Sequence, residues 1–164
     1  SGLGIHGCGN PDVGTSGMPT ISYNKWTFIA VSFNGISYNF NENGTFWYNT
    51  SNRGFVSEPP LFIASQGGCN GGTYEGEISN VQIYNTALTG YQVDQLYRES
   101  ITGVPLYTQN LVMWYPLTMN SKDYASDFNG QPINVTFVPI NASSPIPQSM
   151  NYGVESESEV LNLG

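Results

Sequence analysis

Hydrophobic and polar positions alternate with a period of two through much of the first half of the chain. Residues 26–33 (WTFIAVSF) are apolar on both faces, as expected for an interior strand of a two-layer sandwich. Residues 36–40 alternate cleanly, and residues 45–48 (TFWY) form a third run of strand-forming residues. Asn-Gly pairs at 34–35 and 43–44 separate the runs and are strong hairpin signals. The pattern predicts a three-stranded antiparallel meander.

The next segments predict two more strands and one short helix. Residues 61–64 (LFIA) and residues 78–84 have the composition of buried strands. Thr89 and Gln92 then form a capping box, which is followed by a helical stripe of apolar residues. We therefore expect a helix near residues 90–99. The Gly-, Pro- and Ser-rich first twenty residues are expected to be loop.

Composition and charge exclude two classes of partner. Charged residues make up 10% of the 164-residue chain, and the formal net charge is −8 with a pI near 4.2. The four cations, Lys25, Arg53, Arg98 and Lys122, are scattered, whereas nucleic acids and anionic membranes require clustered Lys and Arg. No apolar run reaches the ~20 residues that span a bilayer, so no membrane insertion is expected.

Two cysteines, Cys8 and Cys69, each lie in a Gly-rich stretch. A metal or redox pair is one interpretation, but neither cysteine has a second Cys or His at ligand spacing. A disulfide that joins two loops is the interpretation we favour. It would indicate an oxidising, extracytoplasmic environment.

Four Asn-x-Ser/Thr sequons provide candidate glycosylation sites. An Asn- and Thr-rich chain contains some sequons by chance, yet four beside a predicted disulfide favour a surface glycoprotein. The localisation that we expect is extracellular or at the cell surface. The candidate acceptors are Asn43, Asn49, Asn134 and Asn141.

The order of elements in residues 24–106 resembles a known family. The runs NKWTFIAVSFNG, YNFNENGTFW, PLFIASQGG and YEGEISNVQIYNTALTGYQVDQLY are similar to the C-terminal half of laminin-G-like, or concanavalin A-like, lectin and glucanase domains. In that family a Trp-led strand enters a hairpin, and a strand followed by a short helix closes the fold. The resemblance implies an all-β fold, an antiparallel β-sandwich of jelly-roll type, with one short helix near residues 90–99.

Residues 111–138 resemble the opening strands of the same family. The chain thus carries the family's second half followed by its first strands, so it either straddles two tandem repeats or uses the strands in permuted order. Because the family's first and last strands are neighbours, we expect residues 111–117 (LVMWYPL) to pair with residues 78–84. We take residues 1–140 as one laminin-G-like β-sandwich domain, and residues 141–164 as a linker or peripheral arm.

The resemblance also suggests where chemistry would lie. Glucanases of this fold place paired carboxylates on one strand, and Glu75 and Glu77 have that spacing. Gly76 lies between them and no further acid follows, so the segment is read as the ordinary entry to the strand and no enzyme is expected. Calcium is common at the rim of these sandwiches, which makes Asp123 and Asp127 candidate ligands. The alternative is a turn in which Asp and Asn side chains cap their own backbone.

Two functions remain open after these considerations. We expect a non-catalytic extracellular module of a cell-surface or filament-forming glycoprotein that acts in adhesion or subunit assembly. Its partners would be neighbouring protein chains, since about a third of a standard family domain is missing and residues 141–164 are suited either to strand donation or to a disordered tail. The alternative is a carbohydrate-binding lectin module that uses Trp47, Tyr48 and Tyr38, with calcium as its one candidate cofactor.

Overall fold

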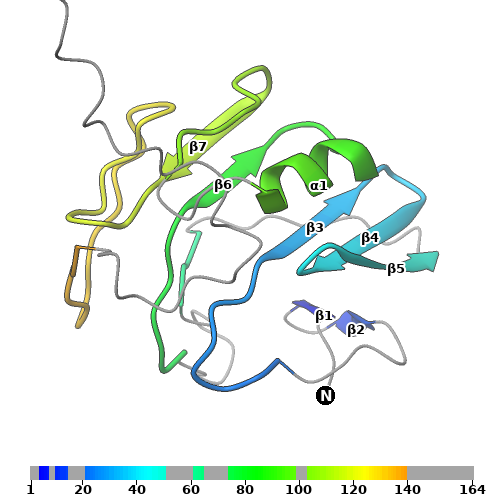
Figure 1. The fold of residues 1–164 in the computed structure, drawn as a ribbon, viewed down its shortest axis with the longest axis horizontal. Coiled ribbons are helices and arrows are strands. Elements are labelled where there is room, and N and C mark those ends of the chain that lie inside the picture. The colour runs from blue at the N-terminus through cyan, green and yellow to red at the C-terminus, as the bar shows by residue number, and fades with distance from the viewer. Residues whose placement is uncertain are drawn as a thin grey trace, which may run out of the picture.

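A computed structural model shows an all-β fold with one short helix (Figure 1). The structure describes residues 4–7, 10–14, 21–50, 61–64, 74–98 and 103–139, and for the first two ranges it describes the backbone. Within these ranges all strand pairs are antiparallel, in the sheets β1-β2, β3-β4-β5 and β6-β7. The elements are β1 (Gly4–Gly7), β2 (Asn10–Gly14), β3 (Ile29–Phe33), β4 (Ser37–Glu42), β5 (Thr45–Thr50), β6 (Val81–Tyr84), α1 (Gly90–Arg98) and β7 (Leu111–Tyr115).

The predicted meander is confirmed as the sheet β3-β4-β5, and its turns follow from the Asn-Gly pairs. Asn43 and Gly44 both have positive φ, 49° and 85°, which is the type I′ geometry that matches the twist of a hairpin. In the first turn, the Asn34 Oδ1 atom accepts hydrogen bonds from the backbone N–H groups of Ile36 and Ser37, at 3.0 and 2.9 Å. These local bonds fix the register of all three strands.

The register divides the sheet into two faces. Tyr38 and Phe40 lie on one face, opposite Phe33 and Trp47 of the neighbouring strands, and they form a buried aromatic cluster. The rings of Phe33 and Tyr38 stack with centroids 4.3 Å apart. We call this side of the sheet the aromatic face. Figure 1 shows β1 and β2 on the side of the sheet away from α1.

Helix α1 packs against the other face of the same sheet, which we call the helix face. The ring of Tyr97 lies 5.6 Å from the ring of Phe28 and also contacts the turn at Gly44, where an added Cβ would lie 3.0 Å from the ring. Val93 and Leu96 are the buried residues of the helix. The apolar stripe of the helix is therefore what holds it on the sheet.

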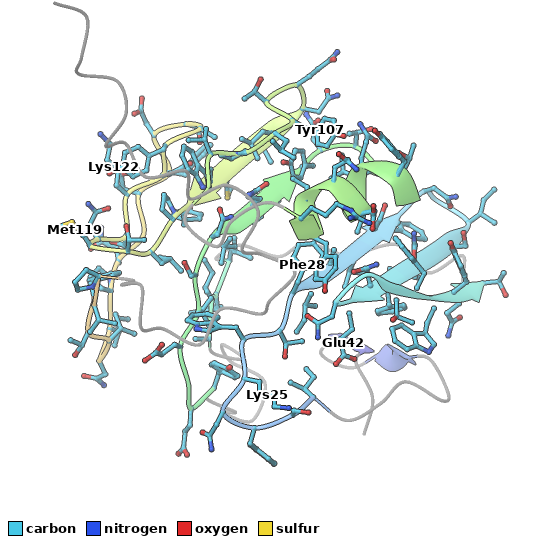
Figure 2. The ribbon with its side chains drawn as sticks, in the orientation of Figure 1. Lys25, Phe28, Glu42, Tyr107, Met119 and Lys122 are labelled. Atoms are coloured by element: carbon cyan, nitrogen blue, oxygen red, sulfur yellow. The ribbon has the colours of Figure 1, made fainter. Side chains whose placement is uncertain are left out.

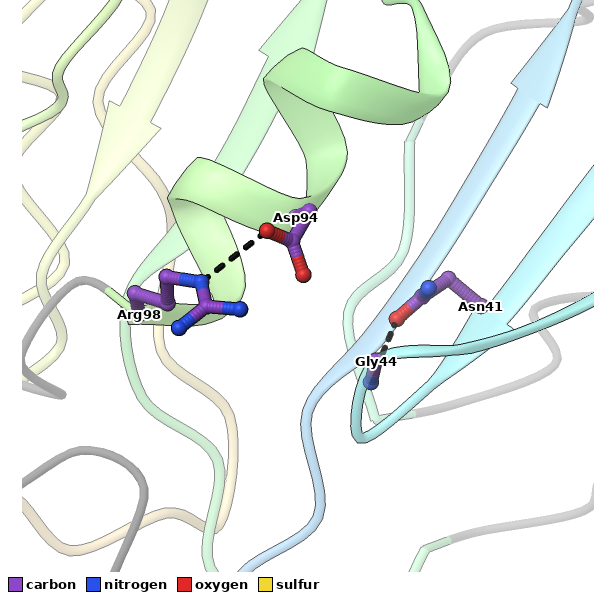
Figure 3. A network of polar contacts seen from close by, with 4 residues as sticks. All are labelled: Asn41, Gly44, Asp94 and Arg98. Carbon is purple, nitrogen blue, oxygen red and sulfur yellow. Dashed lines mark hydrogen bonds and ion pairs between the residues drawn. The ribbon is translucent and has the colours of Figure 1, made fainter.

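The helix begins where its sequence predicts. The Thr89 N–H donates to Gln92 Oε1 at 2.9 Å and the Gln92 N–H donates to Thr89 Oγ1 at 3.2 Å, which confirms the capping box. In the last turn Arg98 forms an ion pair with Asp94 at 2.9 Å, which Figure 3 shows beside the turn that carries Gly44.

Strand β7 pairs with β6 within one chain, so the predicted pairing of residues 111–117 with residues 78–84 is confirmed. Both strands are shorter than expected. Asn80 has φ 53° and its N–H donates to the Pro116 carbonyl at 3.1 Å, so the ladder starts at the next residue. The Asn80 Oδ1 atom also accepts a 3.0 Å bond from the Trp114 indole N–H, which ties the two strands together at this end.

Two expectations about local structure were wrong. Residues 61–64 form no strand: Ala64 has φ 65° and its carbonyl accepts a bond from the Tyr74 N–H, so a turn replaces the ladder. Residues 1–20 are not all loop, because they contain the β1-β2 hairpin, whose polar and Gly-rich sequence carries little strand signal. The predicted arm, residues 141–164, lies outside the described residues.

Candidate functional site

Asp123 lies at the centre of a hydrogen-bond network rather than at an open rim. Its side chain is 2% exposed. Its Oδ1 atom accepts bonds from the backbone N–H groups of Trp114 and Ala125, each at 2.9 Å. Its Oδ2 atom accepts a bond from the Ser126 hydroxyl. The carboxylate thereby joins strand β7 to the loop that follows it.

These contacts determine the protonation of the carboxyl group. Burial by itself would raise the pKa of Asp123, but the bond from the Ser126 hydroxyl and the backbone bonds from Trp114, Ala125 and Ser126 outweigh it, and the net pKa is lowered. Burial also raises the pKa of the neighbouring Tyr115 hydroxyl, and the negative charge of Asp123 adds to that effect. The Tyr115 hydroxyl donates to the Phe128 carbonyl at 2.6 Å.

The candidate calcium ligands Asp123 and Asp127 both border a hollow of about 330 Å³. The Asp123 oxygens, however, accept hydrogen bonds from donors of the chain itself, and Asp127 is exposed on the same loop. Calcium requires six to eight oxygen ligands. Within the described ranges, no three His, Cys, Asp or Glu side chains lie close enough together to hold a metal ion. The residues present therefore fit a self-capped turn better than a calcium ion.

The candidate glycan-binding aromatics are divided between the two faces of the sheet. Tyr38 is buried in the aromatic cluster and Trp47 packs against it. Tyr48 lies on the helix face and is 69% exposed. Of the three predicted residues, therefore, Tyr48 is exposed, Trp47 is partly buried and Tyr38 is buried.

A hollow of about 320 Å³ lies beside Tyr48 on the helix face. Cross-strand register places Ser32, Asn39 and Tyr48 in one row across β3, β4 and β5. The chain just before α1, including Thr89, lines the other side. The Ser32 hydroxyl donates to the Leu88 carbonyl at 3.0 Å, which fixes this wall against the sheet.

Sequence reasoning overlooked the polar residues of this hollow. The strand of residues 36–40 was read with Asn39 on its polar side, and residues 26–33 were read as apolar on both faces, so neither Ser32 nor Asn39 was assigned to a site. The Asn-Gly turns contained the missing signal, because they set the register that aligns both residues with Tyr48. The side of the hollow that includes Thr89 depends on how α1 docks on the sheet, and no local sequence pattern indicates that docking.

The remaining predicted sites are scattered. Asn43 and Asn134 are exposed, whereas Asn49 is half-buried on β5 opposite Tyr38. Asn43 lies at the Asn-Gly turn, where its Oδ1 atom accepts a 2.9 Å bond from the Phe28 N–H. Cys8, Cys69 and Asn141 lie outside the described residues, so their predicted roles stay predictions.

Glu75 and Glu77 are exposed and precede strand β6 instead of lying on it. Figure 2 shows the two described lysines, Lys25 and Lys122, on separate parts of the surface. The described residues include no helix of the length and apolar character needed to cross a membrane.

Comparison with known proteins gives little further information. No protein-family model matches the chain, and no curated protein matches it. The crystal structure of an S-layer domain-containing protein from Clostridium thermocellum is similar over 53% of this chain, with 17% sequence identity and a TM-score of 0.35. This chain covers 44% of that structure. A likeness of this size carries no argument about function.

Proposed function

We propose that this chain is a non-catalytic module of a cell-surface glycoprotein and that it works by associating with further copies of itself. The observation that carries the proposal is an apolar, exposed segment at residues 131–139. It lies outside every ladder of the described structure. We call it the association segment.

The association segment has the amino-acid composition of a β-strand, but no strand of the described structure pairs with it. Ile133, Val135 and Val138 are 75%, 53% and 50% exposed, and Thr136 and Phe137 stand between the two valines. β-branched and aromatic residues favour the pleated, half-buried surface of a sheet. Contiguous exposed apolar side chains mark interaction sites, and addition of a strand to another chain buries them while pairing the backbone.

Neighbouring surfaces are apolar as well. Met119 and Phe128, on the loops that precede the association segment, are exposed, and Figure 2 shows Met119 at the periphery of the molecule. The resemblance to laminin-G-like domains supports the same proposal, because such domains contain strands that have no counterpart among the described strands of this chain. A sheet completed by strands of other copies would supply them.

The rest of the surface supports binding over catalysis. Glu75 and Glu77 lie on an exposed segment, and the residues that line the hollow on the helix face are uncharged. The pattern of glycosylation sequons supports a location at the cell surface. A glycan on Asn134 would occupy the association segment itself, so the proposal places the glycan at Asn43, on the exposed turn between β4 and β5.

The test compares two variants of unglycosylated protein by light scattering after size-exclusion chromatography. Substitution of Val135 and Val138 together by Asp places two charges on the association segment, so we expect the variant to remain a monomer at concentrations where the wild-type protein forms larger species. Ile36→Asp is the matched control, because Ile36 is 72% exposed on a turn of the meander. Monomeric wild-type protein up to millimolar concentration contradicts the proposal, as does a double variant that assembles like the wild type.

A further inference from the structure

We propose that the association segment of one copy pairs with the outer edge of β3 in a second copy, as a fourth strand of the sheet β3-β4-β5. This inference rests on the proposed function, because it names the surface that receives the association segment. Three features carry it: the backbone groups on the outer edge of β3, the apolar side chains beside that edge, and the protection of the competing edge at β7.

The outer edge of β3 presents backbone groups that the neighbouring strand does not use. The Asn43 N–H donates to the Phe28 carbonyl at 3.1 Å, at the start of the ladder between β3 and β4. Hydrogen-bonded pairs alternate along an antiparallel ladder, so Ile29 and Val31, one and three residues further on, direct their N–H and C=O groups away from β4. Among the described strands, β4 is the one that pairs with β3. An edge of this kind is a template for a further strand.

The side chains beside this edge are apolar and exposed. Ile29 and Val31 are 43% and 40% exposed, and the register places both on the aromatic face, opposite Glu42 and Phe40 of β4. Charged residues and prolines commonly protect edge strands, and the sequence of β3, IAVSF, contains neither. A fourth strand would cover these two side chains and pair the backbone groups next to them.

The outer edge of β7, in contrast, is protected by the loop that follows it. The Tyr124 N–H donates to the Trp114 carbonyl at 2.8 Å, and the Trp114 N–H donates to Asp123 Oδ1 at 2.9 Å. A strand that approached β7 would have to displace both bonds. Strand β6 has half-buried residues throughout, and half of β5 consists of Thr and Asn. Strand β3 is therefore the most apolar and accessible edge among the described sheets of the meander and of β6-β7.

The last part of the association segment matches this edge in length and in pattern. Asn134 has φ 53°, so an extended strand can begin at the next residue, and Pro139, which has no N–H, ends it. Val135 and Phe137 lie between them and project to the same side of an extended chain. Their spacing equals that of the two exposed side chains of β3. Neither strand carries a charge, so pairing brings no like charges together.

A second copy is the partner that the arrangement favours. Figure 1 shows residues 131–139, drawn in orange, at one side of the molecule and away from the meander. Pairing within one chain would require the segment to leave this place and cross the molecule, whereas a second copy can present its β3 edge directly. The contact joins two different surfaces, and heterologous contacts of this type build open chains or closed rings.

The experiment mixes two variants, each altered on one side of the proposed contact, and measures mass by light scattering after size-exclusion chromatography. Val31→Glu changes the edge of β3, and the double substitution Val135→Asp with Val138→Asp changes the association segment. Each variant alone should associate about tenfold or more weakly than the wild type. An equimolar mixture should form a heterodimer, because one intact edge meets one intact segment. Both changes add negative charge, so the two altered surfaces do not attract each other.

Tyr48→Glu is the matched control, because Tyr48 is exposed on the other edge strand of the same sheet, and this variant should assemble like the wild type. Ile29→Glu is a second edge variant in case amide spectra show that Val31→Glu does not fold. A wild-type protein that stays monomeric refutes the proposed function and this inference together. If the wild type assembles, the inference alone is overturned when folded edge variants assemble equally well, when the mixture stays monomeric, or when Tyr48→Glu blocks assembly.

Discussion

Asp123 is the residue whose substitution tests the packing of β7 most sharply. In Asp123→Ala the backbone N–H groups of Trp114 and Ala125 lose their acceptor, and so does the Ser126 hydroxyl. In Asp123→Asn a side-chain oxygen can still accept the two backbone bonds, but the charge and one acceptor are lost.

The structure sets the size of both effects. Loss of an acceptor costs about 1 to 3 kcal/mol for each donor left buried. Trp114 is half-buried, so its N–H accounts for most of the lost free energy. Ala125 is exposed, so water can replace the carboxylate as the acceptor of its N–H. We expect Asp123→Ala to lower the free energy of unfolding by about 3 kcal/mol. Asp123→Asn should lower it by about 1 kcal/mol, the difference between charged and neutral acceptors.

The pH dependence has a definite sign. Because the pKa of Asp123 is lower in the folded protein, its ionised form adds stability at pH values above the unfolded pKa of about 3.9. That contribution disappears as the pH falls through the lower, folded value. The difference in stability between the wild type and Asp123→Asn should therefore be constant from pH 7 to about pH 5 and shrink below pH 4.

Urea unfolding followed by tryptophan fluorescence at pH 7, 5, 4 and 3 measures these differences. Asp127→Asn is the matched control on the same loop, and since its side chain is exposed we expect a change below about 0.5 kcal/mol. The reasoning is refuted if Asp123→Ala unfolds at the same urea concentration as the wild type. It is also refuted if the difference between the wild type and Asp123→Asn grows as the pH falls.

Three further substitutions test the packing of the meander and the helix, each by urea unfolding at neutral pH. Gly44→Ala should lower the free energy of unfolding by about 1 to 2 kcal/mol, because φ at this residue is +85° and the new Cβ would lie 3.0 Å from the Tyr97 ring. An unchanged urea midpoint would contradict the docking of α1. Phe40→Ala should cost about 3 to 5 kcal/mol, since Phe40 is fully buried in the aromatic cluster; a loss below about 1 kcal/mol would show that this face is open. Thr89→Ala removes the acceptor of the Gln92 N–H and should cost about 1 kcal/mol, whereas Thr89→Ser should cost little; equal losses would argue against a cap.

The parts of the fold that the sequence predicted are those that local interactions determine. The Asn-Gly turns allow positive φ at low cost, and the capping box satisfies its own backbone, so the meander and the helix could be read from short windows. The pairing of β6 with β7 needed a non-local argument, the resemblance to a family whose first and last strands are neighbours. The prediction of an all-β fold with one short helix follows from these elements.

The errors arise where tertiary context decides. Residues 61–64 have strand composition, yet the left-handed conformation of Ala64 turns the chain. For Asp123 the sequence left a calcium ligand and a self-capped turn both open, because composition shows a carboxylate and not its partners; the structure places the Trp114 N–H on it. Tyr38, Trp47 and Tyr48 are all large aromatic residues, but the two faces of the sheet separate them. Tyr38 is buried and Trp47 packs against it on one face, whereas Tyr48 is exposed on the other.

Hydrogen exchange at the amides of residues 135–138, measured as a function of protein concentration, tests the proposed association most directly. The described structure gives these residues no ladder, so their amides should exchange fast in dilute protein. If the association segment joins a sheet of another copy, we expect their exchange to slow as the mass increases, while the rates in β4 stay constant. Fast exchange at these four residues in the fully assembled species would contradict the account.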